Sequence, residues 1–227
     1  TSDTLIELYT SNNTIARSIS LPPGGGAQGI AYDPQDGDIY VAESQTDTVS
    51  VVSETLGSAV ASVDVGAGPT ALACNPLTGV VYVASQGSST VQAISGQTHK
   101  VVAGASLSGE PNALAIDPST NQLYVALGNV TVFNASTLSV LGYIRVGGGP
   151  VALSIDLLHS LMYVADYSSA TVAIVNLSLA ETAVYVVLTT GPQDLAVSRA
   201  TEDVYVANRF SGALSRVNGS LNTLTSS

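Results

Sequence analysis

The sequence predicts an all-β protein, a β-propeller of four-stranded antiparallel blades, and three observations carry this prediction. The tripeptide Tyr-Val-Ala occurs five times, beginning at Tyr40, Tyr82, Tyr124, Tyr163 and Tyr205. The intervals of 42, 42, 39 and 42 residues are typical of repeat architectures. Short stretches of alternating β-branched residues follow each tripeptide, and no stretch has the apolar spacing of a helix. Units made of strands alone at this period favour propeller blades over a helical solenoid.

The second repeat shows the four strands of one unit most clearly. Its strand candidates are residues 68–74 (GPTALAC), 80–85 (VVYVAS), 90–95 (TVQAIS) and 101–107 (VVAGASL). The segments between them, NPLTG, QGSS and GQTHK, contain the Asn-Pro, Gly and Ser residues that break strands. We name the strands A to D, with A innermost and D outermost. Four strands in about 42 residues match one propeller blade.

A proline recurs at the start of strand A with almost the same spacing. Its positions are Pro69, Pro111, Pro150 and Pro192. Proline at the first residue of a strand removes no ladder hydrogen bond, and the glycines before it allow a sharp turn from strand D into strand A. The one interval of 39 residues has a local cause, because the loop between strands B and C after Tyr124 is three residues shorter than in the other units.

The repeat predicts a single domain over residues 1–227 with five to six blades. The blades cover about 22–65, 66–107, 108–146, 147–188 and 189–227, and residues 1–21 form an N-terminal hairpin that corresponds to strands C and D. Three interpretations of this hairpin stay open. The chain is part of a longer propeller, or it closes into a ring with one two-stranded blade, or a neighbouring molecule completes its unpaired strand edges.

The composition excludes several classes of function. The net charge is −11, with six lysine and arginine residues in total, which argues against binding nucleic acid or anionic lipid through phosphates. Charged residues make up 10% of the chain, and no apolar run reaches the ~18–20 residues that span a bilayer, so no membrane span is predicted. The N-terminal residues lack the pattern of a signal peptide. A surface rich in Ser, Thr and Asn, with few charges, suits an extracellular protein.

No motif for catalysis, cofactor binding or metal binding is present. The sequence contains no G-x-S-x-G, Walker, H-E-x-x-H or C-x-x-C pattern. His99 and His159 fall in separate turns and are expected to be solvated, and the single cysteine, Cys74, is expected to be a small core residue. We therefore predict no catalytic residue, no cofactor and no metal site, and the protein is expected not to be an enzyme.

An aspartate recurs at the end of strand A, at Asp33, Asp117 and Asp156. Aspartate at this place is typical of a turn former, because its side chain accepts a hydrogen bond from its own backbone. A calcium site is the alternative explanation of these carboxylates.

Five N-x-[ST] sequons predict N-glycosylation, at Asn12, Asn129, Asn134, Asn176 and Asn218. All except Asn129 fall in turns between strands C and D, so they gather on one face and its rim. The alternative is that asparagine followed by Ser or Thr is simply good turn chemistry. Mass spectrometry of peptides from native material should find glycan on these C–D turns, and unmodified peptides at all four would contradict the prediction.

The loops on the opposite face are predicted to bind a partner. The residues proposed for this surface are Glu43, Gln86, Asp166, Tyr167, Asn208, Arg209 and Phe210. Exposed aromatic and arginine side chains on loops are typical of binding surfaces.

The sequence resembles the YVTN family of β-propellers, which is common in archaeal surface-layer proteins. The resemblance rests on the strand A segments GPTALA, EPNALAID, GPVALSID and GPQDLAVS, on the turns Asp33-Pro34 and Asp117-Pro118, and on the Y-V-x-x strand B. It covers essentially the whole chain. Y-V-A-x replaces Y-V-T-N throughout, and only the last repeat keeps the asparagine, at Asn208. The resemblance implies a propeller fold and a place at the cell surface.

Together these observations predict a noncatalytic extracellular or cell-surface propeller. It would act in surface-layer or filament assembly or in adhesion, with other surface proteins or with copies of itself as partners. The alternatives are a ligand-binding domain of a larger surface receptor and a propeller enzyme, lyase-like or a redox partner, with its site at the central channel.

Overall fold

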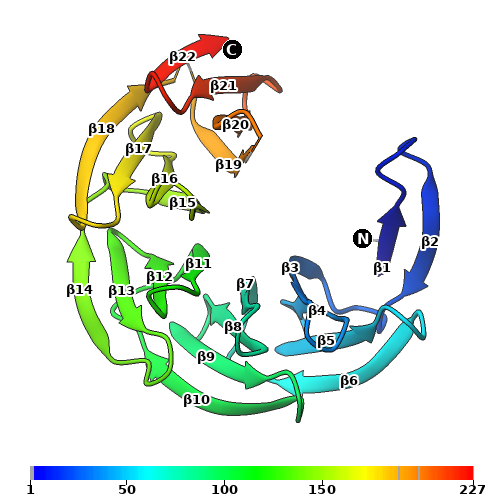
Figure 1. The fold of residues 1–227 in the computed structure, drawn as a ribbon. Coiled ribbons are helices and arrows are strands. Elements are labelled where there is room, and N and C mark those ends of the chain that lie inside the picture. Colours follow the sequence, from blue (N-terminus) through cyan, green and yellow to red (C-terminus); the bar gives the residue numbers. More distant parts are fainter. Residues whose placement is uncertain (1–2, 189, 199, 227) are drawn as a thin grey trace. The chain divides into compact units, whose positions relative to one another are not determined.

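The computed structural model describes residues 3–188, 190–198 and 200–226, except for the side chains of residues 182 and 183 (Figure 1). Within these ranges every regular element is a β-strand, and the strands form six antiparallel sheets. Five sheets have four strands and one has two. The all-β class and the four-stranded antiparallel blades are thus confirmed. Among the described residues no helix is long and apolar enough to cross a membrane.

The chain divides into two compact units, Thr1–Glu110 and Pro111–Ser227, and each is considered by itself. Unit one begins with the two-stranded hairpin β1 (Thr4–Leu8) and β2 (Ile15–Ser20). Its first blade is β3 (Ala27–Asp33), β4 (Asp38–Glu43), β5 (Thr48–Ser53) and β6 (Ser58–Asp64). Its second blade is β7 (Pro69–Asn75), β8 (Val80–Ser85), β9 (Thr90–Ser95) and β10 (Lys100–Ser106). The bounds of β8 and β9 are as predicted, and those of β7 and β10 differ from the prediction by one residue.

Unit two contains three blades. They are β11 (Ala113–Asp117), β12 (Gln122–Ala126), β13 (Val130–Asn134) and β14 (Val140–Ile144); β15 (Pro150–Asp156), β16 (Leu161–Asp166), β17 (Thr171–Asn176) and β18 (Glu181–Val187); and β19 (Pro192–Val197), β20 (Asp203–Asn208), β21 (Leu214–Asn218) and β22 (Thr223–Ser226). Each blade pairs its strands in chain order, as a meander. The short B–C loop predicted in the third repeat is confirmed by the strand register, because Tyr124 pairs with Val132, eight residues on, whereas Tyr82 pairs with Ala93, eleven residues on.

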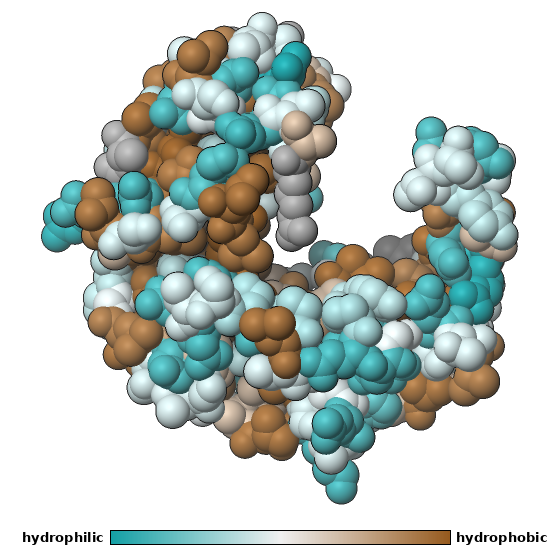
Figure 2. Space-filling model, in the orientation of Figure 1, coloured by the Kyte–Doolittle hydropathy of each residue, from teal (hydrophilic) through white to brown (hydrophobic). Residues whose placement is uncertain are grey.

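The two middle strands are largely buried on both faces in every four-stranded blade except the last, whereas the outer strand is exposed. All but one residue of β8 and of β16 are buried, and most residues of β10 are exposed. This explains why strand B reads as the near-continuous apolar run V-Y-V-A rather than as strict alternation. On the surface turned to the viewer in Figure 2, hydrophobic residues are scattered among hydrophilic ones.

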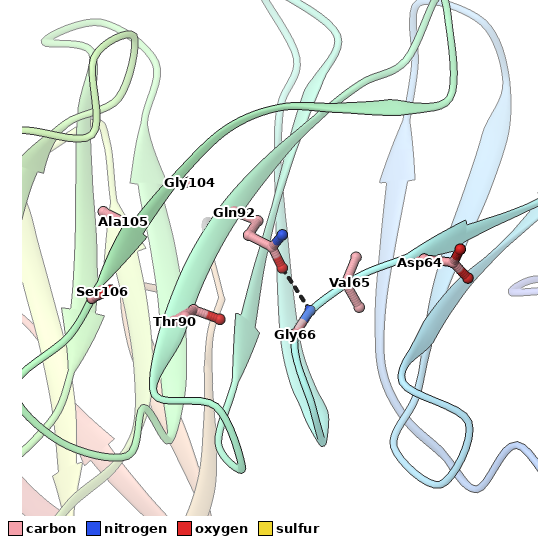
Figure 3. Close-up of a pocket in the computed structure, with 8 residues that line it drawn as sticks. All are labelled: Asp64, Val65, Gly66, Thr90, Gln92, Gly104, Ala105 and Ser106. Carbon is pink, nitrogen blue, oxygen red and sulfur yellow. Dashed lines mark hydrogen bonds between the residues drawn. The ribbon is translucent and has the colours of Figure 1, made fainter.

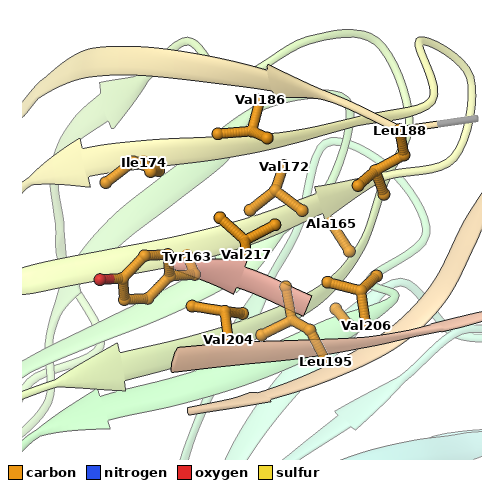
Figure 4. Packing of buried hydrophobic residues seen from close by; sticks show 11 residues of the cluster. Tyr163, Ala165, Val172, Ile174, Val186, Leu188, Leu195, Val204, Val206 and Val217 are labelled. Atoms are coloured by element: carbon orange, nitrogen blue, oxygen red, sulfur yellow. The ribbon is translucent and has the colours of Figure 1, made fainter. Parts of the chain in front are cut away.

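Neighbouring blades within a unit are held together by a layer of apolar side chains. In unit two, Tyr163 and Ile174 of one blade face Leu195, Val204 and Val217 of the next (Figure 4). The A strands of successive blades also lie side by side, as β11 does with β15 and β15 with β19. Burial of apolar area between blades is therefore the main force that orders each unit.

The tyrosine of the repeated tripeptide belongs to this layer. Tyr40, Tyr82, Tyr124 and Tyr163 are each at most 2% exposed, so they are core residues. Tyr205 differs from them, because it is 37% exposed. Tyr163 packs against Leu195 and Val204 of the following blade, whereas Tyr205 lies in the last blade of unit two.

Candidate interaction surface

Tyr167 and Phe210 form an exposed aromatic pair on two adjacent B–C loops of unit two. Tyr167 directly follows β16, and Phe210 comes two residues after β20. Their ring centroids lie 6.0 Å apart with an angle of 49° between the planes, a tilted contact. Phe210 is 72% exposed, and the neighbouring Arg209 is exposed as well. The structure thus brings together three of the residues predicted to bind a partner.

Gly191 allows this arrangement. It lies between β18 and β19, and a Cβ atom added there would come within 3.1 Å of Cδ2 of Tyr167. Since real Cβ atoms seldom make contacts that short, a larger residue at position 191 would push the tyrosine ring from its place beside Phe210.

Glu43, Asp166 and Asn208 are not on the surface, although the sequence analysis assigned them to it. Each is the residue after the repeated tripeptide, and their exposed fractions are 1%, 0% and 4%. Both carboxylate oxygens of Asp166 hold neighbouring backbone, since Oδ2 accepts a hydrogen bond from N of Gly149 at 3.0 Å and Oδ1 accepts one from N of Ser169 at 2.9 Å. Asp166 thus organises the turns beneath the loops, and the side chains of all three residues are buried.

Asn208 and Glu43 occupy the same inward position with different chemistry. Asn208 donates from Nδ2 to Oγ of Ser215 at 2.8 Å. Burial raises the pKa of Glu43, and the Ser50 hydroxyl only partly offsets this effect. The sequence did contain a signal of this burial, because Leu127 and Ser85 stand at the equivalent position of the other repeats.

Gln86 is half-buried in the B–C loop of the second blade of unit one. Its backbone N–H donates to the carbonyl oxygen of Gly68 at 2.9 Å, which ties the loop to the start of strand A. Because Gln86 lies in the other unit, it is not assigned to the surface around Tyr167 and Phe210.

The sequon asparagines of unit two have a clear turn function. Oδ1 of Asn134 accepts a hydrogen bond from the backbone N of Ser136 at 3.0 Å. Oδ1 of Asn176 accepts one from N of Leu179 at 3.1 Å, and Oδ1 of Asn218 accepts one from N of Leu221 at 2.7 Å. In unit one, Asn12 uses Oδ1 in the same way toward N of Thr14. Asn129, also in unit two, is exposed in the B–C loop between β12 and β13. These bonds support the turn-chemistry alternative. They leave glycosylation as a prediction, since a glycan is attached to Nδ2, which takes no part in them.

His159 lies between two carboxylates from adjacent blades rather than as an isolated solvated residue. Its Nδ1 is 2.7 Å from Oδ2 of Asp156, and its Nε2 is 3.3 Å from Oε1 of Glu202. The hydrogen bond with Asp156 raises the pKa of His159. Ser220 donates to Oε2 of Glu202 at 2.6 Å and not to the histidine. Acyl transfer needs the nucleophile hydrogen-bonded to the base, whereas here the serine is bonded to the acid. The contacts of His159 with Asp156 and Glu202 therefore serve to bridge two adjacent blades.

An open groove of about 340 Å³ lies in unit one where the connection from β6 to β7 passes the second blade (Figure 3). Oε1 of Gln92 accepts a hydrogen bond from N of Gly66 at 2.7 Å and anchors this connection. Asp64 and Thr90 line the groove together with backbone and small residues. The groove therefore holds the connection in place and offers little chemistry to a ligand.

Comparison with known proteins supports the fold of this chain. No family model matches the sequence, and no curated protein matches it. Hydrazine synthase of Kuenenia stuttgartiensis is similar in structure, with a TM-score of 0.74, 15% identity, and coverage of 87% of this chain and 67% of that one. A chain in the crystal structure of the mitotic checkpoint complex is similar with a TM-score of 0.85, 12% identity, and coverage of 99% and 71%. Both are β-propeller-type folds, and at these identities the likeness shows that this chain is a β-propeller.

Proposed function

We propose that the chain is a noncatalytic β-propeller of the YVTN, surface-layer type found in archaea, acting outside the cell or at the cell surface through protein–protein contacts. Its role would be in surface-layer or filament assembly or in adhesion. The observation that carries this proposal is the exposed pair Tyr167 and Phe210 beside Arg209 on adjacent loops. Tyrosine and arginine are the residue types enriched at the energetic centres of protein interfaces.

The cost of exposing this pair supports a binding role. Phe210 leaves most of a large apolar side chain in water, and burying such a side chain stabilises a contact by about 1.5–3 kcal/mol. Arg209 adds a planar cation to a chain of net charge −11, so it offers the surface a local donor group for a carboxylate of the partner. Two aromatic rings held in mutual contact also lose little side-chain entropy on binding.

The position of the sequons supports an extracellular location. Asn134, Asn176 and Asn218 are the last residues of β13, β17 and β21, where the C–D turns begin, at the end of each blade opposite to the B–C loops. Glycans on those turns would leave the loops that carry Tyr167 and Phe210 accessible to protein. The expected partners are other surface proteins or further copies of this chain, and no cofactor is expected.

A photo-reactive residue at position 210 tests the proposal. The matched control is position 221 in the C–D turn of the same blade, since Leu221 is 70% exposed and Phe210 is 72% exposed. With native cell envelope present, we expect cross-links to a surface protein or to a second copy from position 210 and few from position 221. Equal yields at the two positions, or adducts with neither kind of protein, would refute the proposed surface.

A further inference from the structure

The turn from β3 to β4 carries three carboxylates, a combination that its sister turns lack. It reads DPQDGD over residues 33–38, whereas the equivalent turns read NPLTGV (75–80), DPSTNQ (117–122), DLLHSL (156–161) and SRATED (198–203). The first position is aspartate or asparagine in four of the five turns. Acids at the first, fourth and sixth positions together occur only in the first turn, at Asp33, Asp36 and Asp38.

The turn itself requires only one side-chain oxygen at its first position. Oδ1 of Asp33 accepts a hydrogen bond from N of Gln35 at 3.0 Å, and Oδ1 of Asn75 accepts one from N of Leu77 at the same distance. Because asparagine serves equally well in the second blade, the negative charge of Asp33 is not explained by the turn. Its second oxygen, Oδ2, has no role in that bond.

Oδ2 of Asp33 is buried without a matching donor. Asp33 is 0% exposed, and among the described residues no nitrogen or oxygen donor reaches Oδ2. The thiol of Cys74 lies beside the carboxylate, and a thiol is only a weak donor. A buried carboxylate oxygen left in this state is costly, so it indicates a missing positive partner.

This oxygen points at a cradle formed by the neighbouring blade. A Cβ atom added to Gly96 would lie 2.6 Å from Oδ2 of Asp33, 2.6 Å from the carbonyl oxygen of Gly79 and 3.0 Å from Oδ2 of Asp36. The Gly79 oxygen already accepts a bond from N of Gly96 at 2.8 Å and retains a second lone pair. Three acceptor oxygens therefore converge on the side of Gly96 that any other residue would fill.

Asp38 and His99 extend the cluster. The ligand atoms of Asp36, Asp38 and His99 all lie within 4.8 Å of one another. Asp38 is 7% exposed, and its Oδ2 is 3.1 Å from Nε2 of His99. The cluster thus joins the A–B turn of the first blade to two turns of the second.

We propose that this cradle binds a divalent cation, Ca²⁺, through the carboxylates of Asp33 and Asp36 and the carbonyl oxygen of Gly79. Calcium takes six to eight oxygen ligands in flexible geometry, and water completes such a set. Zinc prefers four tetrahedral nitrogen or sulfur ligands, which one histidine does not supply. His99 is assigned as the hydrogen-bond partner of Asp38 behind the cation. The bound cation links the first two blades of unit one.

Asp33→Asn is the decisive variant, because Asn75 shows that asparagine keeps this turn. The matched control is Asp117→Asn, the same change at the same turn position in the third blade. With the full chain stripped of metal by a chelator, we expect calorimetric titration to show Ca²⁺ binding with a Kd of about 10⁻⁴–10⁻³ M, the range of extracellular modules. Asp33→Asn should weaken this binding about tenfold or more, since affinity follows the ligand charge count. Asp117→Asn should bind as the wild type does.

The melting temperatures give a second signature that a purely structural role would not produce. In chelator, Asp33→Asn should melt no lower than the wild type, because a buried repulsive charge is removed. In millimolar Ca²⁺ the order should reverse. Absence of Ca²⁺ binding by the wild type, or equal binding by the two variants, would overturn the site. Tighter binding of Zn²⁺ that is lost in His99→Ala would overturn its assignment to calcium.

Discussion

Replacing Tyr163 by alanine should lower the free energy of unfolding by about 3–5 kcal/mol, the range for a large buried aromatic side chain. Tyr163 is 1% exposed, and its ring packs against Leu195 and Val204 of the following blade (Figure 4). The substitution removes these contacts and leaves a cavity between two blades. Chemical denaturation of the full chain, followed by tyrosine fluorescence and circular dichroism, measures the free energy of unfolding of the variant and of the wild type.

Tyr205→Ala is the matched control for this prediction. It removes the same side chain from the same tripeptide, but Tyr205 is 37% exposed. Its loss of stability should be less than about 2 kcal/mol, because much of its ring is in water in the folded state. If both variants lost the same stability, the repeated tyrosine would act within its own blade, and our account of blade-to-blade packing would fail.

Replacing Asp166 by alanine should cost about 2–4 kcal/mol, although sequence analysis placed this residue on a binding surface. The carboxylate accepts hydrogen bonds from the backbone of Gly149 and Ser169, and its removal leaves both N–H groups without a charged acceptor. The contact between Oδ2 and the Cβ position of Gly147 shows how closely the D–A turn is folded around this side chain. A melting curve for the variant measures the effect.

Asp166→Asn and Asp194→Ala control for shape and for charge. The asparagine keeps one acceptor oxygen and should lose about half as much stability as Asp166→Ala. Asp194 is exposed, and its Oδ1 accepts a bond from N of the adjacent Leu195, so its removal should be nearly neutral. If Asp166→Ala left stability unchanged but weakened partner binding, Asp166 would belong to the interaction surface after all.

The strands could be predicted from the sequence because their signals are local and repeated. Four-strand units followed from the spacing of the tripeptide, and Asn-Pro and Gly marked the turns so closely that β8 and β9 have the predicted bounds. The exposed loop residues Tyr167 and Phe210 followed from the same alignment. These features need no knowledge of how one blade meets the next.

The rest could not be predicted because it depends on contacts between blades. A charged residue after a strand normally marks a loop, so the sequence predicts that Glu43 lies on the surface. This prediction is wrong, because the side chain of Glu43 is buried. The pairing of His159 with Glu202, and of Asp33 with the Gly79 and Gly96 turns, joins positions from different repeats. Such pairings arise only when adjacent turns are placed side by side.

The central claim, that this propeller works by protein–protein contact, is tested most directly by the mass of the native particle. Light scattering after gentle extraction gives that mass, and denaturing mass spectrometry gives the mass of the polypeptide that contains this chain. We expect a particle that holds two or more copies, or a copy with another surface protein. A particle with the mass of a single polypeptide, unchanged when envelope proteins are added, would contradict the account.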